Sequence, residues 1–313
     1  MLSSWAWVFF TLCGAITQTA RNAMQRDLIA ALGPIGAAFV RFLYGLPFAL
    51  LFLALAIWTQ DGRTLAPNAA TWAWTSLGAG AQIGGTALML AAMRVKSFVV
   101  VTAYTKTEPI QAALFGATFL HETLSARAWG AIALASLGVA LTAAPQDRGS
   151  TAPQDQAPVA PQDETPAPRG GMGPALLGIA AAALFALSAV AFRAGVLALE
   201  PSFLGASTVL TLSLAVQSAA ILCFLVLWDR AGLRAIARAW RRSIAPGFVG
   251  ALGSQFWFIA FALETAARVR TLALVEIVFA QIVTRRAFHQ TTRRIELVGM
   301  AMIALGVGVL LAS

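Results

Sequence analysis

Charge is scarce in this sequence, and lysine is scarcer still. Only 11% of the 313 residues are charged and just two are lysines, whereas a soluble domain carries about 25% charged residues. The rest is strongly apolar, with 59% hydrophobic residues and a mean hydropathy of +0.76. Because an apolar helix of about 20 residues crosses a bilayer core, this composition excludes an ordinary soluble domain and predicts a polytopic membrane protein.

Several chemical signatures are also absent. The sequence has no Walker A motif, no H-E-x-x-H motif, and only two histidines and two cysteines. We therefore expect no ATP coupling, no metal site and no cofactor. The net charge of +9 comes from basic residues between apolar stretches. Membrane lipids are the expected partners of those residues, rather than nucleic acid.

Ten apolar spans can be drawn, and each is expected to be a helix because backbone amides in lipid must pair within the chain. Their ranges are 5–20, 35–58, 72–92, 98–120 and 129–143 in the first half, and 174–196, 203–228, 248–263, 272–283 and 295–311 in the second. Between the halves, residues 144–173 contain Ala-Pro-Gln-Asp three times and few apolar residues. This composition predicts a disordered linker.

The two halves are copies of one another. Three landmarks of the first half recur 168 positions later: Glu108, His121 and Gly138 correspond to Glu276, His289 and Gly306. With five spans in each copy, the second copy enters the membrane from the opposite side. The predicted fold class is therefore an all-α integral membrane protein with ten transmembrane helices. They form two inverted five-helix repeats, 1–143 and 174–313, as in secondary transporters.

Both copies resemble the EamA domain of the drug/metabolite transporter superfamily. The resemblance rests on Thr107-Glu108-Pro109, on the turn His121-Glu122-Thr123 and on Leu137-Gly138-Val139 in the first copy. The second copy departs from the pattern at Ile277 and Gln290, where proline and glutamate are usual. The resemblance implies a ten-helix carrier of small organic solutes with a central cavity between its halves, and it leaves the solute open.

Of the 13 carboxylates, Glu108 and Glu276 lie well inside predicted spans, and Glu296 stands at the very start of the span 295–311. A charged side chain at that depth is expected to face protein or water, because lipid solvates it poorly. The pair could bind a cationic group or take up protons. Alternatively, each glutamate could cap a break in its own helix, which Pro109 favours for Glu108. The residues alone leave both interpretations open, although the family carries this glutamate with many substrates, which favours the structural one.

Two cations, Lys106 and Arg41, also lie in predicted spans. Lys106 stands about 200° around a helix from Glu108, so we expect the two to face different ways, with Lys106 directed to another helix. Each cation could pair with a glutamate or meet a substrate carboxylate. Tyr104 and Gln111 continue the stripe of Glu108. The substrate-binding candidates are Gln18, Arg41, Gln82, Tyr104, Lys106, Glu108, Gln111, Gln255, Trp257 and Glu276. The resemblance implies that most of the polar residues among them could line the cavity, and each is about equally suited to an interhelical hydrogen bond.

Residues 229–243 are expected to form a short helix on the membrane surface. Leu233, Ile236 and Trp240 share one helical face, and the arginines of this stretch lie mostly away from it. This pattern is typical of interfacial helices. The helix could serve as a simple anchor or bind anionic lipids.

Together these features predict a secondary transporter, not an enzyme, that exports or exchanges a small polar organic metabolite such as an amino acid by alternating access. The alternative is a membrane-embedded enzyme acting on lipid or lipid-linked substrates. We expect a multi-pass protein of the plasma (inner) membrane, and we leave its oligomeric state open. Loops after odd-numbered spans hold 15 of the 22 Arg and Lys residues, which places both termini outside. The family keeps them inside, and we favour the family because the surface helix supplies five of the 15.

Overall fold

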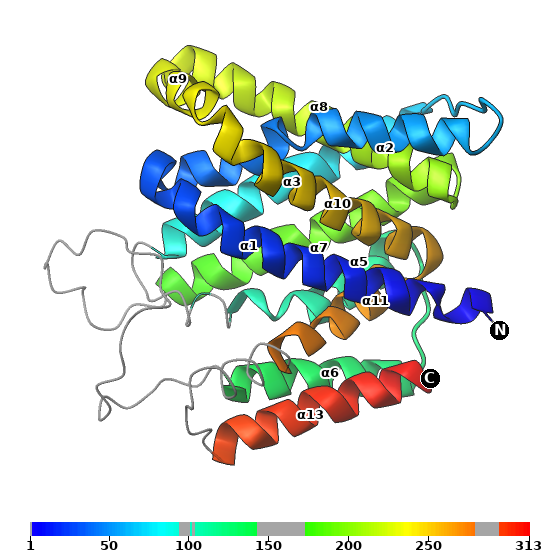
Figure 1. The fold of residues 1–313 in the computed structure, drawn as a ribbon. Coiled ribbons are helices and arrows are strands. Elements are labelled where there is room, and N and C mark those ends of the chain that lie inside the picture. Colours follow the sequence, from blue (N-terminus) through cyan, green and yellow to red (C-terminus); the bar gives the residue numbers. More distant parts are fainter. Residues whose placement is uncertain (1, 94–100, 102–103, 143–172, 279–293) are drawn as a thin grey trace, which may run out of the picture. The chain divides into compact units, whose positions relative to one another are not determined.

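The structure is a computed structural model that describes residues 2–93, 101, 104–142, 173–278 and 294–313, and helices are the only regular elements of that part of the chain (Figure 1). The helices are α1 (Leu2–Leu43), α2 (Leu46–Trp58), α3 (Ala69–Met93), α5 (Glu108–Phe119), α6 (Ala126–Thr142), α7 (Gly173–Leu199), α8 (Phe203–Trp228), α9 (Arg230–Arg238), α10 (Trp240–Leu263), α11 (Ala266–Ala273) and α13 (Arg294–Leu311). The predicted linker lies outside the described residues except for Gly173, which begins α7.

Several helices are suited to a bilayer. Five helical stretches are long and apolar enough to cross it: Leu28–Trp58, Ala69–Met93, Ala175–Leu199, Phe203–Trp228 and Trp240–Leu263. Two shorter apolar helices are Ala126–Thr142 and Ile295–Leu311. Large apolar side chains point outward, and Trp58 and Trp228 are 78% and 73% exposed. The protein is an all-α integral membrane protein, and the total of ten spans stays a prediction.

The first two predicted spans are joined differently from what we expected. Helix α1 continues through residues 21–34 and bends at Gly33, whose φ of 70° lies in the left-handed region. Pro34 follows, and a residue before proline avoids the helical conformation. A second break stands at Gly45, where a Cβ would lie 2.3 Å from the carbonyl oxygen of Arg41. The predicted span 35–58 therefore consists of the last residues of α1 followed by the whole of α2.

The described chain divides into two compact units that differ from the two halves of the sequence. Unit 1 combines residues 1–83 and 187–269, and unit 2 combines residues 84–186 and 270–313. The divisions fall inside α3, α7 and α11. Each unit thus draws on both predicted repeats, so the repeat boundary at 144–173 and the packing boundary are separate properties of the chain.

In unit 1, α1 and α10 run antiparallel and side by side (Figure 1). A Cβ on Gly14 would lie 3.1 Å from the Trp257 ring, and a Cβ on Gly250 would lie 3.2 Å from Cδ of Arg21. Residue numbers therefore rise along α1 as they fall along α10. Small residues at such contacts let two helices approach closely, which is how membrane helices pack.

In unit 2, α6 and α13 also run antiparallel (Figure 1). A Cβ on Gly138 would lie 2.6 Å from the carbonyl oxygen of Gly299, and one on Gly306 would lie 2.8 Å from that of Ala131. Adding 168 to Gly138 gives Gly306, and subtracting 168 from Gly299 gives Ala131. The two contacts are therefore the same contact with the repeats exchanged, as expected for a self-complementary interface.

Candidate functional site

Two helical stretches of unit 2 are interrupted at repeat-equivalent positions. The first has a turn at Lys106 and Thr107, after which α5 begins at Glu108. The second has a turn at Leu274 between α11 and the helical residues 275–278. Lys106 and Leu274 are 168 positions apart. Transporter binding sites are typically built around discontinuous helices of this kind.

Each interruption places a glutamate in the first turn of the following helical segment. Glu108 is the first residue of α5, and Glu276 is the second residue of the segment 275–278. The N-terminus of a helix carries a partial positive charge that stabilises a carboxylate. Pro109 suits the start of a helix because it has no N–H to pair, whereas the second copy has Ile277 at this position. Proline therefore explains only the first break.

The two glutamates of unit 2 are held in ion pairs with cations. Lys106 Nζ contacts Glu276 Oε1, and Arg270 Nε lies 2.9 Å from Glu108 Oε1, although these last two atoms lack the alignment of a hydrogen bond. The four side chains are only 16–22% exposed. Two positive and two negative charges thus form a neutral cluster, which we call the charge cluster (Lys106, Glu108, Arg270 and Glu276).

The charge cluster corrects one expectation from helical geometry. We expected the two side chains to face different ways, with Lys106 directed to another helix. Lys106 does contact Glu276 on another helical segment, but Glu108 lies against Arg270 on the same interrupted stretch. The turn at Lys106 and Thr107 interrupts the regular rotation per residue on which that expectation rested. Arg270 was not among the sequence candidates, because we assigned it to a loop between spans.

The remaining polar stripe of unit 2 has one unused acceptor. Gln111 Nε2 donates to Thr107 Oγ1 at 3.0 Å, while Gln111 Oε1 is buried without a hydrogen-bond partner. Tyr104 packs against α7, where a Cβ on Gly178 would lie 2.7 Å from the Tyr104 Cβ. A buried acceptor without a partner is unusual in a protein, so Gln111 is the member of the stripe best suited to contact a ligand.

The candidates of unit 1 form interhelical contacts. Gln217 Nε2 donates to Gln82 Oε1 at 2.7 Å, and Gln255 Nε2 donates to Ser207 Oγ at 2.9 Å. Gln217 and Gln255 each keep a buried oxygen without a hydrogen-bond partner. Gln217 was missed by the sequence analysis, although a glutamine inside the apolar span 203–228 was a usable signal.

Three further candidates lie along the contact between α1 and α10 or next to it. Trp257 packs on Gly14 and stacks with Phe261 at 6.4 Å between ring centroids. The Gln18 backbone nitrogen would lie 3.7 Å from a Cβ on Gly253. The Arg41 guanidinium lies 4.2 Å from the centroid of the Phe42 ring, a favourable cation–π arrangement. The structure thus places these candidates in unit 1 and the charge cluster in unit 2.

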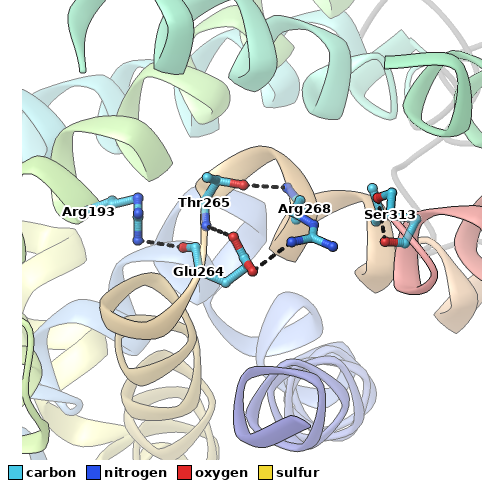
Figure 2. A network of polar contacts seen from close by, with 6 residues as sticks. Arg193, Glu264, Thr265, Arg268 and Ser313 are labelled. Atoms are coloured by element: carbon cyan, nitrogen blue, oxygen red, sulfur yellow. Dashed lines mark hydrogen bonds and ion pairs between the residues drawn. The ribbon is translucent and has the colours of Figure 1, made fainter. Parts of the chain in front are cut away.

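A separate polar network in unit 1 closes the end of α10 (Figure 2). Arg193 Nη1 donates to the carbonyl oxygens of Phe261 and Glu264 at 2.5 and 2.6 Å. The Glu264 carboxylate accepts from the Thr265 backbone N–H at 2.8 Å and from Arg268 Nη1 at 2.9 Å. Arg193 thus satisfies carbonyls at the C-terminal end of α10 that lack partners within the helix.

No group of three histidine, cysteine or acidic side chains that could hold a metal ion occurs within the part of the chain that the structure describes. His121 is exposed and has a φ of 52°, and its counterpart His289 lies outside that part.

Apolar helices long enough to span a bilayer, two interrupted helical stretches and a neutral cluster of charges are together typical of a membrane transporter. The comparison with protein families makes this specific, since the model described as "EamA-like transporter family" matches residues 5–144. Residues 5–144 are therefore an EamA-like transporter domain, which places this part of the chain in the drug/metabolite transporter superfamily.

Solved structures support the fold. One titled "Crystal structure of protein" matches 99% of this chain and 95% of its own chain, with a TM-score of 0.66 and 14% sequence identity. At that identity the likeness concerns the fold alone. No curated protein matches the chain.

Proposed function

We propose that the chain is a secondary transporter that moves a small zwitterionic or neutral polar metabolite, such as an amino acid, by alternating access. The observation that carries this proposal is the charge cluster at two repeat-equivalent helix breaks. Discontinuous helices expose backbone groups and helix ends to a solute at mid-membrane. Balanced charges at such a site favour a solute whose own charges also balance.

The chemistry of the charge cluster supports a zwitterion more than a net ion. A solute with one carboxylate and one ammonium group can take the place of both partners of the Lys106–Glu276 pair. Lys106 then meets the carboxylate and Glu276 meets the ammonium, so no buried charge is left unpaired. Gln111 lies three residues after Glu108, and its unpaired side-chain oxygen could accept a hydrogen bond from the ammonium group of the solute. Mutual neutralisation for stability alone is the competing role of the cluster, and the experiment below separates the two.

The helix contacts support an inverted-repeat architecture, which alternating access requires here. The α6–α13 contact is antiparallel and maps onto itself when the repeats are exchanged. Gly253 lies close to Thr17 in unit 1, and Gly85 lies close to Phe185 in unit 2. Each residue of the second contact is 168 positions from one residue of the first, since Thr17 corresponds to Phe185 and Gly85 to Gly253. Inverted repeats bring equivalent helices together in opposite directions. We therefore propose two inverted repeats of five spans, 1–143 and 174–313.

The test uses the full chain, purified and reconstituted in liposomes with an internal metabolite mixture. Release or exchange of solutes is read by mass spectrometry, with empty liposomes as the background. We expect one or a few zwitterionic solutes to cross, and we expect Lys106→Gln and Glu276→Gln to abolish their movement. Arg63→Gln is the matched control, because it breaks an ion pair with Glu200 that is largely exposed.

Three outcomes decide the proposal. Passage of cations or anions alone would contradict the zwitterion, and unchanged transport in both cluster variants would assign the cluster a purely stabilising role. Chemically modified lipid without any solute movement would favour the enzyme alternative.

We further propose export across the plasma (inner) membrane with both termini in the cytoplasm. A C-terminal reporter that is active only outside the cytoplasm would contradict that orientation.

A further inference from the structure

A dense cationic surface lies on α9 and on the first turn of α10. It consists of five exposed arginines: Arg230, Arg234, Arg238, Arg241 and Arg242. The other face of α9 is turned to the protein, where Ile236 is only 3% exposed and Leu233 is half-buried. A short helix with one apolar and one strongly basic face is typical of a helix that lies in the headgroup layer of a membrane.

No carboxylate of the described residues neutralises these arginines. Among the described residues, none of the five forms an ion pair with a carboxylate. Arg230 and Arg234 donate from Nε to backbone carbonyls at 2.9 and 3.2 Å, and Arg241 stands 5.3 Å from the Trp240 ring centroid. The adjacent acid, Asp229, accepts from the Gly232 backbone N–H at 2.8 Å and so caps α9. The positive charge of this surface is therefore available to an external anion.

Apolar residues show where the surface lies relative to the bilayer. The spanning helix α8 ends at Trp228, which is 73% exposed, and α10 begins at Trp240, which is 49% exposed. Leu227 and Ile244 on the same two helices are also exposed. Tryptophan prefers the boundary between lipid and water. Arg230, Arg234 and Arg238 lie between these two tryptophans in the sequence, and Arg241 and Arg242 directly follow Trp240. We therefore expect all five arginines at the level of the lipid phosphates.

We propose that α9 and the first turn of α10 form a binding site for anionic phospholipids, with the arginines holding the headgroup phosphates. A guanidinium presents a planar set of donors that matches a phosphate in two parallel hydrogen bonds. Anionic headgroups also supply the negative charge that the five arginines lack among the described residues. The proposal requires the chain to lie in a membrane and does not depend on which solute it carries.

The proposed lipid site contacts the break between α1 and α2 through Tyr44. The Tyr44 hydroxyl donates to the carbonyl oxygen of Ile236 at 3.0 Å, and Tyr44 follows Arg41 by one helical turn. Tyr44 also packs on α10, because a Cβ on Gly247 would lie 2.7 Å from the Tyr44 Cβ. A lipid that holds α9 in place therefore also stabilises the α1–α2 break.

The test is native mass spectrometry of the purified full chain in an equimolar mixture of phosphatidylglycerol and phosphatidylcholine. We expect the wild type to retain phosphatidylglycerol preferentially. The variant Arg234→Gln/Arg238→Gln/Arg241→Gln is expected to lose that preference by about tenfold or more, since each basic residue near an anionic surface contributes on the order of 1 kcal/mol. Arg234→Lys/Arg238→Lys/Arg241→Lys keeps the charge and is expected to keep most of the binding. The single variant Arg238→Gln is expected to weaken the preference by a smaller factor. Its control is Arg127→Gln, which removes one charge from an exposed position at the start of α6.

Three results would overturn the proposal. Equal retention of the two lipids by the wild type, or an unchanged preference in the glutamine variant, would exclude a headgroup site at these arginines. Displacement of the bound lipid by millimolar inorganic phosphate would assign the site to a soluble anion instead. Tyr44→Phe keeps all five arginines, so we expect it to bind phosphatidylglycerol while showing a smaller lipid-dependent rise in unfolding temperature. The thermal unfolding of each variant reports directly whether it is folded.

Discussion

Lys106 pairs with Glu276, which is the repeat counterpart of Glu108, and not with Glu108 itself two residues further along the chain. The cation of one predicted repeat thus compensates the carboxylate of the other. Each glutamate depends on a residue distant in sequence, because Glu108 lies against Arg270. This cross-pairing links the two interrupted stretches of unit 2, and it leads directly to the first prediction.

Removing one partner of the Lys106–Glu276 pair is expected to destabilise the protein more than removing both. Lys106→Gln or Glu276→Gln leaves a partly buried charge alone, and we expect each to lower the free energy of unfolding by about 2 kcal/mol. The double variant is expected to recover about half of that loss. Thermal unfolding in detergent measures the three variants, and additive losses in the double variant would show that the two groups are not coupled.

Gly138 and Gly130 on α6 form a matched pair for testing the α6–α13 contact. A Cβ on Gly138 meets backbone atoms of α13 at under 3 Å, whereas one on Gly130 meets nothing within 4 Å. Gly138→Ala is expected to destabilise the protein by about 1–3 kcal/mol through overpacking. Gly130→Ala is expected to be neutral or slightly stabilising, because alanine favours a helix. Equal unfolding temperatures for the two variants would contradict the close contact.

Gln111→Leu tests whether the unused acceptor meets the solute. Leucine has a similar volume and no polar group, so the buried oxygen disappears without leaving a large cavity. We expect KM to rise about tenfold, as for a lost hydrogen bond to a charged group, while the unfolding temperature changes little. A fall in stability with an unchanged KM would assign Gln111 to structure alone.

The Arg63–Glu200 pair predicts a component of acid sensitivity outside the spanning helices. The Ser202 side chain, followed by the hydrogen bond and charge of Arg63, lowers the pKa of the Glu200 carboxyl below 4.5, against the opposing effect of desolvation. A lowered folded-state pKa means that the stabilising contribution is complete above the unfolded value and disappears as pH falls through the folded value. Glu200→Gln is expected to lack this component when unfolding is followed between pH 3 and 6 (roughly one unit or more on either side of an ordinary glutamate pKa). An identical pH dependence in the variant would exclude it.

Apolar length predicted much of the fold, because lipid leaves few alternatives to a helix. The span 203–228 matches α8 at both ends. Charges between spans were less informative, because residues 21–34 contain arginines and an aspartate and still continue α1. A surface helix tolerates such residues, so their presence does not mark a loop. The predicted span 248–263 begins later than α10, which starts at Trp240. Pro246 lies inside α10 near its N-terminal end, whereas proline usually interrupts a helix.

The candidate site was predictable in part. Glu108 and Glu276 stood out because a carboxylate within an apolar span requires a partner. Their partners were harder to identify, because pairing across 170 residues depends on tertiary packing. Arg270 escaped detection because it lies at the edge of an apolar stretch, where basic residues are common. The stripe of Tyr104, Glu108 and Gln111 assumed a regular helix, and the turn at Thr107 separates its first member from the other two.

The two glutamates of the charge cluster occupy equivalent positions in the two predicted repeats, whereas its two cations do not. The repeat counterpart of Lys106 is Leu274, and that of Arg270 is Thr102. In the proposed cycle the two repeats exchange conformations, so the opposite state presents leucine and threonine at the positions equivalent to these cations. The inward-open and outward-open states of the empty carrier are then expected to differ in free energy, so one of the two states is populated more than the other. Such a difference is expected to give the carrier different apparent affinities for its solute on the two sides of the membrane, while the direction of net movement is still set by the driving gradient.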